Sequence, residues 1–367
     1  MEREREPELE QLYDQGKKVY SISRLNTLNQ CEYQAYLSYI KEEDGKNIGI
    51  YGKLGGRTHD TIEACIKGEA SKEDLKEAIL QELDDLEMCG IEFPLDRNGN
   101  STIRDNWIAN MIRFSEEFTT PKGVYDTEKL LILPIDDEHY MIGYADAIRH
   151  NSKDKNKVWL IDWKTSSQFT GDHLIEAGRQ LVVYKLALEK LGYEVTKCSW
   201  CMVKYCITKY QQYVKKNKEY VEKEKISEWR NLIKDLKNVI EKFLKEAGYE
   251  DVDIECFLHE CLKNNSFDPL PNDIKEKFST KIYVRDYDIT DEIISETLDY
   301  IKTSINKYEE YGDEEFNYKP CDCNKNAFFC NSLCDFGGKS GQCKYWVDYC
   351  NTFEKDKKEE DDDADLF

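Results

Sequence analysis

The sequence lacks any apolar run near the roughly 20 residues that a helix needs to cross a membrane. Its opening stretch, Met1 to Glu6, is polar, so the pattern of a charged and then apolar leader is missing as well. These absences argue against a membrane protein, and we expect a soluble, intracellular one. With 367 residues the chain is long enough to bury a sizeable core, and one elaborated domain is the expected organisation.

The sequence also lacks an excess of positive charge. It has 52 Lys and Arg against 74 Asp and Glu, which gives a formal charge of -22. Residues 354–367 hold eight acids against three lysines and so contribute -5, while the remaining -17 lies in the body of the chain. Tight nonspecific binding to a phosphate backbone needs clustered basic residues, so any surface that binds nucleic acid must be local.

A nucleotide-binding phosphate loop is absent. Gly337-Gly-Lys-Ser340 resembles its end, but Leu333 stands where the motif needs its first glycine. The sequence therefore excludes an NTPase of this type, and it encodes no helicase.

What the chain does contain is a dense unit between Glu128 and Tyr184. The pattern predicts three strands and then a helix that carries Gln180 and Tyr184, with the strands at Glu128 to Pro134, Tyr140 to Arg149 and Lys157 to Thr165. Side chains alternate along a strand, so Asp162 and Lys164 share one face of the third strand. Asp146 ends the apolar run before the hairpin turn, so we expect it to converge with Asp162.

Two carboxylates at adjacent strand ends form a hard-oxygen site for Mg²⁺ or Mn²⁺, and a lysine beside them can orient a water or offset charge on a phosphate. This constellation predicts metal-dependent phosphodiester chemistry. Gln180 and Tyr184 lie four residues apart, on one helix face, and can hold substrate over the metal. Taken alone, such a pair is more often structural.

These residues resemble a known family. Gly143-Tyr-Ala-Asp146, Asp162-Trp-Lys164 and Gln180-Leu-Val-Val-Tyr184 are similar to motifs II and III and the Q-x-x-x-Y signature of the PD-(D/E)xK nuclease superfamily, in its RecB/AddB-like branch with CRISPR-adaptation and phage exonucleases. Gly55-Gly-Arg-Thr-His59 resembles the segment with the histidine that completes the branch's metal site. The resemblance implies an α/β fold with a restriction-endonuclease-like mixed sheet flanked by helices, and His59, Asp146 and Asp162 as metal ligands.

Fourteen cysteines are present, and six of them fall in the last fifty residues: Cys321, Cys323, Cys330, Cys334, Cys343 and Cys350. In a reducing compartment such a group indicates a metal site before a disulfide framework, although it contains no C-x-x-C pair. The resemblance implies a [4Fe-4S] cluster that staples the two ends of the nuclease together. Its ligands are then Cys31, Cys330, Cys334 and Cys343, with Cys321, Cys323 or Cys350 as alternatives.

The rest of the chain is expected to be mainly helical. In the N-terminal part we predict four helices: Ser21 through Leu37, which contains Cys31; one after Gly55-Gly56 that includes His59; Ser71 to Cys89; and Thr102 to Phe118. Further along we predict a long helix over Gln211 to Gly248, mostly helical structure within Asp251 to Lys277, and a helix from Thr290 or Asp291 to Tyr311. Two more strands are predicted, at Glu194 to Ile207 and at Lys281 to Tyr287. The predicted division is a flexible 1–18, a helical 19–125, a nuclease core 126–210, a helical insertion 211–280, a strand, helix and cysteine cluster 281–353, and a disordered acidic tail 354–367.

The resulting prediction is a metal-dependent DNA nuclease, an exonuclease that acts on single strands or DNA ends in recombination, repair or replication. It is expected in the cytoplasm of a bacterium or a phage-infected cell. The tail, which ends in Leu366 and Phe367, resembles the acidic tips that dock on replication and repair proteins, while a merely solvating tail is the alternative. The rival function is a noncatalytic iron-sulfur DNA-binding adaptor, which has no need of the charged set Asp146, Asp162 and Lys164.

Overall fold

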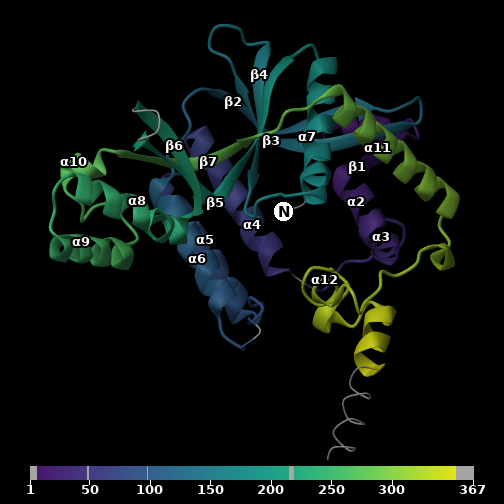
Figure 1. The fold of residues 1–367 in the computed structure, drawn as a ribbon. Helices are drawn as coiled ribbons and strands as arrows, with labels where there is room; N and C mark the ends of the chain where they lie inside the picture. Colours follow the sequence, from purple (N-terminus) through teal and green to yellow (C-terminus); the bar gives the residue numbers. More distant parts are fainter. Residues whose placement is uncertain (1–5, 48, 97, 215–218, 353–367) are drawn as a thin grey trace, which may run out of the picture.

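A seven-stranded mixed sheet organises the protein (Figure 1). The computed structural model describes residues 6–47, 49–96, 98–214 and 219–352. The strands are β1 (Lys18–Ser21), β2 (Val124–Pro134), β3 (His139–His150), β4 (Lys157–Lys164), β5 (Glu194–Val214), β6 (Glu219–Glu228) and β7 (Phe278–Asp286). Their order is β1-β3-β4-β5-β6, with β2 paired to β3 and β7 paired to β5.

Two strands share one edge of β3, and this arrangement creates the site described below. β1 pairs parallel to β3 over His139–Ile142, and β4 pairs antiparallel to it over Ala147–His150. Among the described residues, 143–146 have no strand partner on that edge. Beyond Ile161, β4 leaves β3 and continues only beside β5, so a gap opens in the sheet next to Asp146.

Helices cover both faces of the sheet. They are α1 (Pro7–Asp14), α2 (Ile22–Gln30), α3 (Glu32–Tyr39), α4 (Ile50–Lys67), α5 (Lys72–Met88), α6 (Thr102–Glu117), α7 (Asp172–Lys190), α8 (Leu232–Glu246), α9 (Asp251–Asn264), α10 (Asn272–Lys275), α11 (Asp291–Tyr311) and α12 (Ala327–Ser332), with short 3-10 helices η1 (Trp229–Asn231), η2 (Glu315–Asn317) and η3 (Gly338–Ser340). No helix in the described part of the chain is long and apolar enough to span a membrane.

Side chains along β4 point alternately to the two faces of the sheet, and each face has its own hydrophobic core. Val158 and Leu160 pack with α2, α7 and α11, whereas Ile161 and Trp163 pack with α4, α5, α6, α8 and α9. Asp162 and Lys164 follow the parity of Leu160 and so belong to the face that α7 covers. The predicted mixed α/β fold, with a curled sheet flanked by helices, is confirmed.

Helix starts were predicted well where a local cap marks them. Ser21, Ser71 and Thr290 each accept a hydrogen bond from a backbone N–H in the first turn, and Ser71 forms a reciprocal capping box with Asp74. The helix over Thr102 to Phe118 is also confirmed, as α6.

Four predictions of local structure are wrong, and three of them concern the N-terminal part. The helix expected from Ser21 through Leu37 breaks at Cys31, whose extended backbone (φ -152°, ψ 103°) ends α2 and begins α3. The helix through His59 begins before the glycine pair, at Ile50. Residues 6–18 are not wholly flexible, since they contain α1 and the first residue of β1, which pairs with β3.

The largest error concerns the long lysine-rich helix predicted from Gln211 to Gly248. β5 runs on to Val214 and forms a hairpin with β6, and a helix, α8, begins only at Leu232. The residues that seemed to recur at helical spacing include Val221 and Ile226, which are β-branched and lie in the β5–β6 ladder. Cross-strand pairing, which local spacing does not report, determines the structure here.

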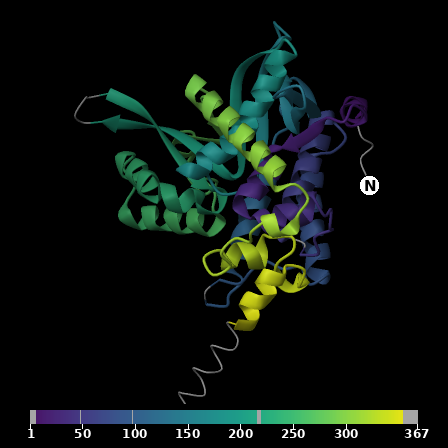
Figure 2. The same ribbon diagram turned by 90° about the vertical axis from the view of Figure 1, so that its right-hand side faces the viewer.

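The C-terminal part folds against the N-terminal helices (Figures 1 and 2). The Tyr33 N–H donates to the carbonyl of Lys319 at 3.0 Å, although the two residues are far apart in sequence. A small core under this contact contains Cys31, Tyr33 and Leu37 from the N-terminal side, and it contains Cys330, Cys334, Phe336, Cys343 and Trp346 from the C-terminal side. The acidic tail 354–367 lies outside the described residues.

Candidate active site

Six residues predicted from the sequence lie together at the gap between β3 and β4. Asp146 comes from β3, Asp162 and Lys164 from β4, His59 from α4, and Gln180 and Tyr184 from α7. His59 contacts Asp146, and a chain of contacts leads from Asp162 through Lys164 and Gln180 to Tyr184. The sequence-based expectation that the two aspartates converge depends on the hairpin register, which pairs Ala147 with Ile161.

The side chain of Asp146 bridges the gap between β3 and β4, where the two strands no longer pair through their backbones. Its Oδ2 accepts a hydrogen bond from the Trp163 N–H at 2.7 Å, and the Nδ1 of His59 lies 3.6 Å from the same oxygen. Burial, followed by the negative charge of Asp162, raises the pKa of Asp146 to about 8. Asp146 is thus held in place by the backbone of β4 and, in the absence of a cation, favours its protonated form at neutral pH.

Asp162 is the most buried carboxylate of the site. Its Oδ2 forms an ion pair with the Nζ of Lys164 at 2.7 Å, while its Oδ1 has no hydrogen-bonding partner among the described residues. A buried carboxylate with an unfilled oxygen is costly unless a cation or a water completes its surroundings.

Lys164 connects the carboxylates to α7. Its Nζ donates to Oε1 of Gln180 at 3.2 Å, and Nε2 of Gln180 donates to the Tyr184 hydroxyl at 2.9 Å. Burial lowers the pKa of Lys164, but Asp162 and Asp146 raise it by more, so it ends above its ordinary value and the ammonium stays charged. Burial raises the pKa of Tyr184, which stays a neutral phenol.

His59 supplies a neutral imidazole. Burial, aided by the positive charge of Lys164, lowers its pKa, against the opposing effect of Asp162 and Asp60. Neutral imidazole is the form that binds a metal. Its helix lies close to the end of β4, since a Cβ on Gly55 would lie only 3.1 Å from Oγ1 of Thr165, the first residue after the strand.

The donor set fits a divalent cation, although its geometry is not that of a closed metal site. Within the described ranges, no group of three or more His, Cys, Asp or Glu side chains is placed closely enough to hold a metal ion. The residues nevertheless match the hard ligands that Mg²⁺ and Mn²⁺ take, and the unfilled Oδ1 of Asp162 marks where one would bind. His59, Asp146 and Asp162 are the residues that would hold it.

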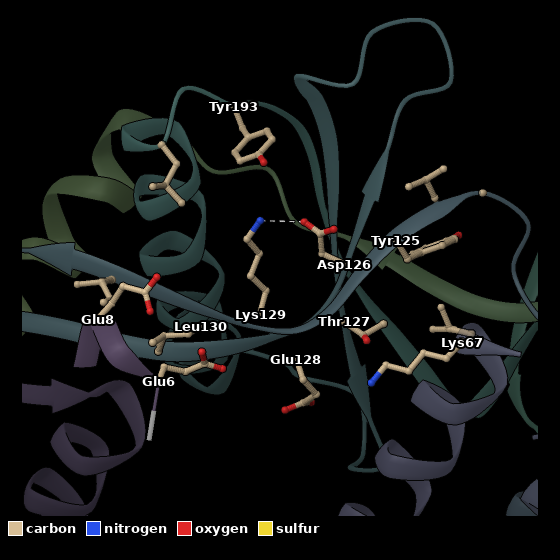
Figure 3. A pocket seen from close by; sticks show the side chains of 15 residues that line it. Glu6, Glu8, Lys67, Tyr125, Asp126, Thr127, Glu128, Lys129, Leu130 and Tyr193 are labelled. Carbon is tan, nitrogen blue, oxygen red and sulfur yellow. Dashed lines mark hydrogen bonds and ion pairs between the residues drawn. The ribbon is translucent and has the colours of Figure 1, made fainter. Parts of the chain in front are cut away.

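A large cavity nearby includes Glu128, whose charge acts on Asp146. It has a volume of about 1100 Å³ and lies along β2, where Lys129 pairs with Asp126 at 2.9 Å (Figure 3). Asp146, Asp162 and Lys164 do not line it. Its walls mix acidic and basic side chains, so we assign no function to it.

One contributor to the site was missed by the sequence reasoning. Glu128 lies in β2 between the pairs Thr127–Ala147 and Lys129–Ala145, and its charge adds to the raised pKa of Asp146. Its φ of 47° is rare for a residue other than glycine. The predicted hairpin register could have placed it across from Asp146, but nothing in the sequence signals its backbone conformation.

The curled mixed sheet, its flanking helices and the carboxylate and lysine group at the split between β3 and β4 define a nuclease fold. A model of the PD-(D/E)XK nuclease superfamily matches residues 19–262, which is more than half of the chain. The protein belongs to this superfamily. No curated protein matches the chain.

The buried Asp146 makes stability depend on pH when no metal is bound. Its folded-state pKa of about 8 exceeds its ordinary 3.8, so the stability it contributes is full below pH 3.8 and is lost as pH rises through 8. In EDTA, the free energy of unfolding is expected to fall between pH 5 and pH 9 by on the order of 3 kcal/mol more in the wild type than in Asp146→Asn. Denaturant unfolding at both pH values measures this difference, and identical pH dependence in the two proteins would contradict it.

Proposed function

We propose that the protein is a metal-dependent DNA exonuclease that degrades single strands or DNA ends. The observation that carries the proposal is the group formed by Asp146, Asp162 and Lys164 at the gap in the sheet of a nuclease-superfamily protein. A buried charge group of this kind is costly for folding, and a purely structural adaptor gains nothing from it.

Each residue has a proposed role. His59, Asp146 and Asp162 hold one or two Mg²⁺ or Mn²⁺ ions, which supply Lewis acidity and an acidified water when bound. To serve as a ligand, Asp146 would have to be deprotonated. Lys164 stays protonated, orients the attacking water and offsets the charge that builds up on the phosphate. Gln180 and Tyr184 hold Lys164 and orient the strand near the metal.

Exonuclease action is testable with substrate topology. We expect a linear single-stranded DNA to be degraded in Mn²⁺ or Mg²⁺, while a single-stranded circle of the same sequence survives. Labels at the 5′ and 3′ ends, followed through the product ladder, then give the polarity. Equal rates on the circle and the linear strand would replace the exonuclease with an endonuclease.

We further propose that the protein belongs to the RecB/AddB-like branch and carries a [4Fe-4S] cluster on Cys31, Cys330, Cys334 and Cys343. All four cysteines are buried in the small core that joins the two ends of the chain. Cys31 is far from the other three in sequence, so a cluster on these ligands would link the two ends. A hydrogen bond from Cys321, the largest cause, lowers the pKa of Cys31 to about 6 and so favours its thiolate. Thiolates are the ligands that such clusters take.

Two further cysteines keep the ligand set open to test. The Sγ of Cys321 lies 3.6 Å from the Sγ of Cys330, and the Cys321 N–H donates to the Sγ of Cys31 at 3.4 Å. Cys321 and Cys323 are partly exposed, in contrast to the four proposed ligands. Burial protects a cluster from solvent. The greater burial of Cys31, Cys330, Cys334 and Cys343 therefore favours these four as the ligands.

Replacing Cys334 with serine is therefore expected to abolish the brown colour and the bound iron of anaerobically purified protein. Loss of this long-range cross-link is expected to cost about 2–5 kcal/mol of unfolding free energy, as for a disulfide that closes a long loop. Iron analysis and denaturant unfolding measure both effects. Cys321→Ser is expected to retain iron, and the exposed Cys89→Ser is the matched control. Zinc without iron in the wild type would overturn the cluster.

The remaining proposals concern partners, location and organisation. We propose that the tail 354–367 docks on replication or repair proteins, that the protein acts in the cytoplasm, and that 19–125, 126–210, 211–280 and 281–353 are its main parts, with the end of β5 and all of β6 included in the third. Deleting residues 354–367 is expected to remove partner capture in a pull-down while leaving DNA cleavage intact. Unchanged capture would remove the docking role.

A further inference from the structure

A second, smaller pocket opens beside the catalytic lysine. It has a volume of about 490 Å³, and Lys164 and Gln180 form part of its wall. The rest comes from the loop between β4 and α7, from the first turns of α7, and from α2, which is distant from both in sequence. The pocket residues of α2 and of this loop are not among the proposed metal ligands.

The loop between β4 and α7 is fixed to the sheet beneath it. The guanidinium of Arg285 on β7 donates to the carbonyl of Phe169, and the Phe169 ring packs edge-on against Trp200 with centroids 5.1 Å apart. Ser166 and Ser167 precede this anchor, line the pocket and are exposed. The backbone that carries these hydroxyl groups is therefore anchored to the sheet close by, at Phe169.

The opposite wall offers a further donor. Oδ1 of Asn26 on α2 accepts a hydrogen bond from the Tyr300 hydroxyl at 2.7 Å. This bond occupies the carboxamide oxygen, so the group that Asn26 offers to the pocket is its NH₂ donor. Ser23, one turn earlier on the same helix, adds another hydroxyl to this wall.

The charge of the pocket suits a single phosphate. His173 and Glu176 lie on the rim with Nδ1 and Oε2 3.0 Å apart, so Glu176 is engaged by a neighbour. Lys164 is the fixed cation of the wall, and the remaining donors are neutral hydroxyl and amide groups. Such groups make many of the phosphate contacts in nucleic-acid complexes. Local donors of this kind allow a chain with a formal charge of -22 to hold a strand.

The size of the pocket indicates what size of ligand it can hold. A volume of about 490 Å³ falls within the roughly 300–1,000 Å³ of small-molecule sites, so it accommodates a nucleotide unit and not a duplex. An unpaired nucleotide fits this space. Its phosphate lies next to Lys164, and hence next to the carboxylates.

We propose that this pocket is a subsite for one unpaired nucleotide next to the scissile phosphate, with Ser166, Ser167 and Asn26 donating hydrogen bonds to its phosphate. The proposal rests on the proposed nuclease function and specifies its substrate as single-stranded nucleic acid. Ser166, Ser167 and Asn26 are positioning residues, because they hold the strand without touching the reacting atoms.

The test is the double variant Ser166→Ala with Ser167→Ala, assayed on a labelled oligo-dT substrate in Mn²⁺. Loss of two hydrogen bonds to a charged group is expected to raise KM about tenfold or more, with kcat changed less than about threefold. Asn26→Ala is expected to act in the same direction. Ser101→Ala with Ser152→Ala is the matched control, since neither residue lines the pocket, and thermal melting verifies that each variant folds.

A second measurement separates this proposal from the nuclease function. Fluorescence anisotropy with the same oligo-dT in EDTA reports binding without cleavage. If the wild type never cleaves, a binding loss of about tenfold in the double variant relative to the control still supports the subsite. If the wild type cleaves, an unchanged KM in the double variant overturns the subsite and leaves the nuclease standing. Unchanged anisotropy in the double variant overturns it in either case.

Discussion

Replacement of Lys164 with alanine is expected to reduce the rate of DNA cleavage by about 10²–10³-fold, the usual loss when one preorganised group that stabilises transition-state charge is removed. The ammonium lies 2.7 Å from Asp162 and 3.2 Å from Gln180, so it is held on both sides. Its raised pKa keeps it charged through the neutral range. The alanine variant loses this charge at the position where the phosphate becomes more negative.

Single-turnover cleavage of end-labelled single-stranded DNA in Mn²⁺ measures this loss. Lys185→Ala is the matched control: it removes a lysine of α7 that pairs with Glu189 one turn away and does not contact the carboxylates. Its rate is expected to stay within about twofold of the wild type, because an exposed ion pair of this kind contributes little. A Lys164→Ala protein that melts normally and cleaves at the wild-type rate would remove Lys164 from the mechanism.

The second large effect is expected at Gly143, where β3 passes directly under α7. A Cβ at this position would lie 2.4 Å from Cε1 of Tyr184 and 2.7 Å from its hydroxyl oxygen. Tyr184 is buried and bonded to Gln180, so its ring has little room to move. Gly143→Ala is therefore expected to destabilise the fold by about 1–3 kcal/mol, as overpacking in a core does.

The same substitution is expected to lower activity. A displaced Tyr184 carries Gln180 with it, and Gln180 is the acceptor that holds Lys164. Denaturant unfolding and the cleavage assay together measure both effects. Gly52→Ala is the control, since no atom lies within 4 Å of a Cβ added there and alanine favours the helix α4. Equal stability of Gly143→Ala and the wild type would show that the strand and helix are not in such close contact.

The sequence predicted the residues of the site because their placement depends on local geometry. Alternation along a strand placed Asp162 and Lys164 on one face, and a short turn brought Asp146 to the same end of the hairpin. Helix starts at Ser71 and Thr290 followed from capping chemistry that acts within one turn. The roles assigned to these residues are still predictions, which the experiments above test.

Features that arise from distant parts of the chain could not be predicted in the same way. Continuation of β5 into a hairpin with β6 depends on strand pairing, and it replaced the first half of the predicted helix over Gln211 to Gly248. The pocket beside Lys164 needs Asn26, which approaches the loop after β4 only in the folded chain. Neither hydrophobic spacing nor residue type reports these contacts.

The most direct test of the central claim compares the wild type with Asp162→Asn on end-labelled single-stranded DNA, each in Mn²⁺ and in EDTA. We expect the wild type to degrade the strand in Mn²⁺ and to leave it intact in EDTA, while Asp162→Asn leaves it intact in both. A folded wild-type protein that binds the strand and never cuts it, with Mn²⁺ or Mg²⁺ present, would contradict the nuclease and favour the noncatalytic adaptor.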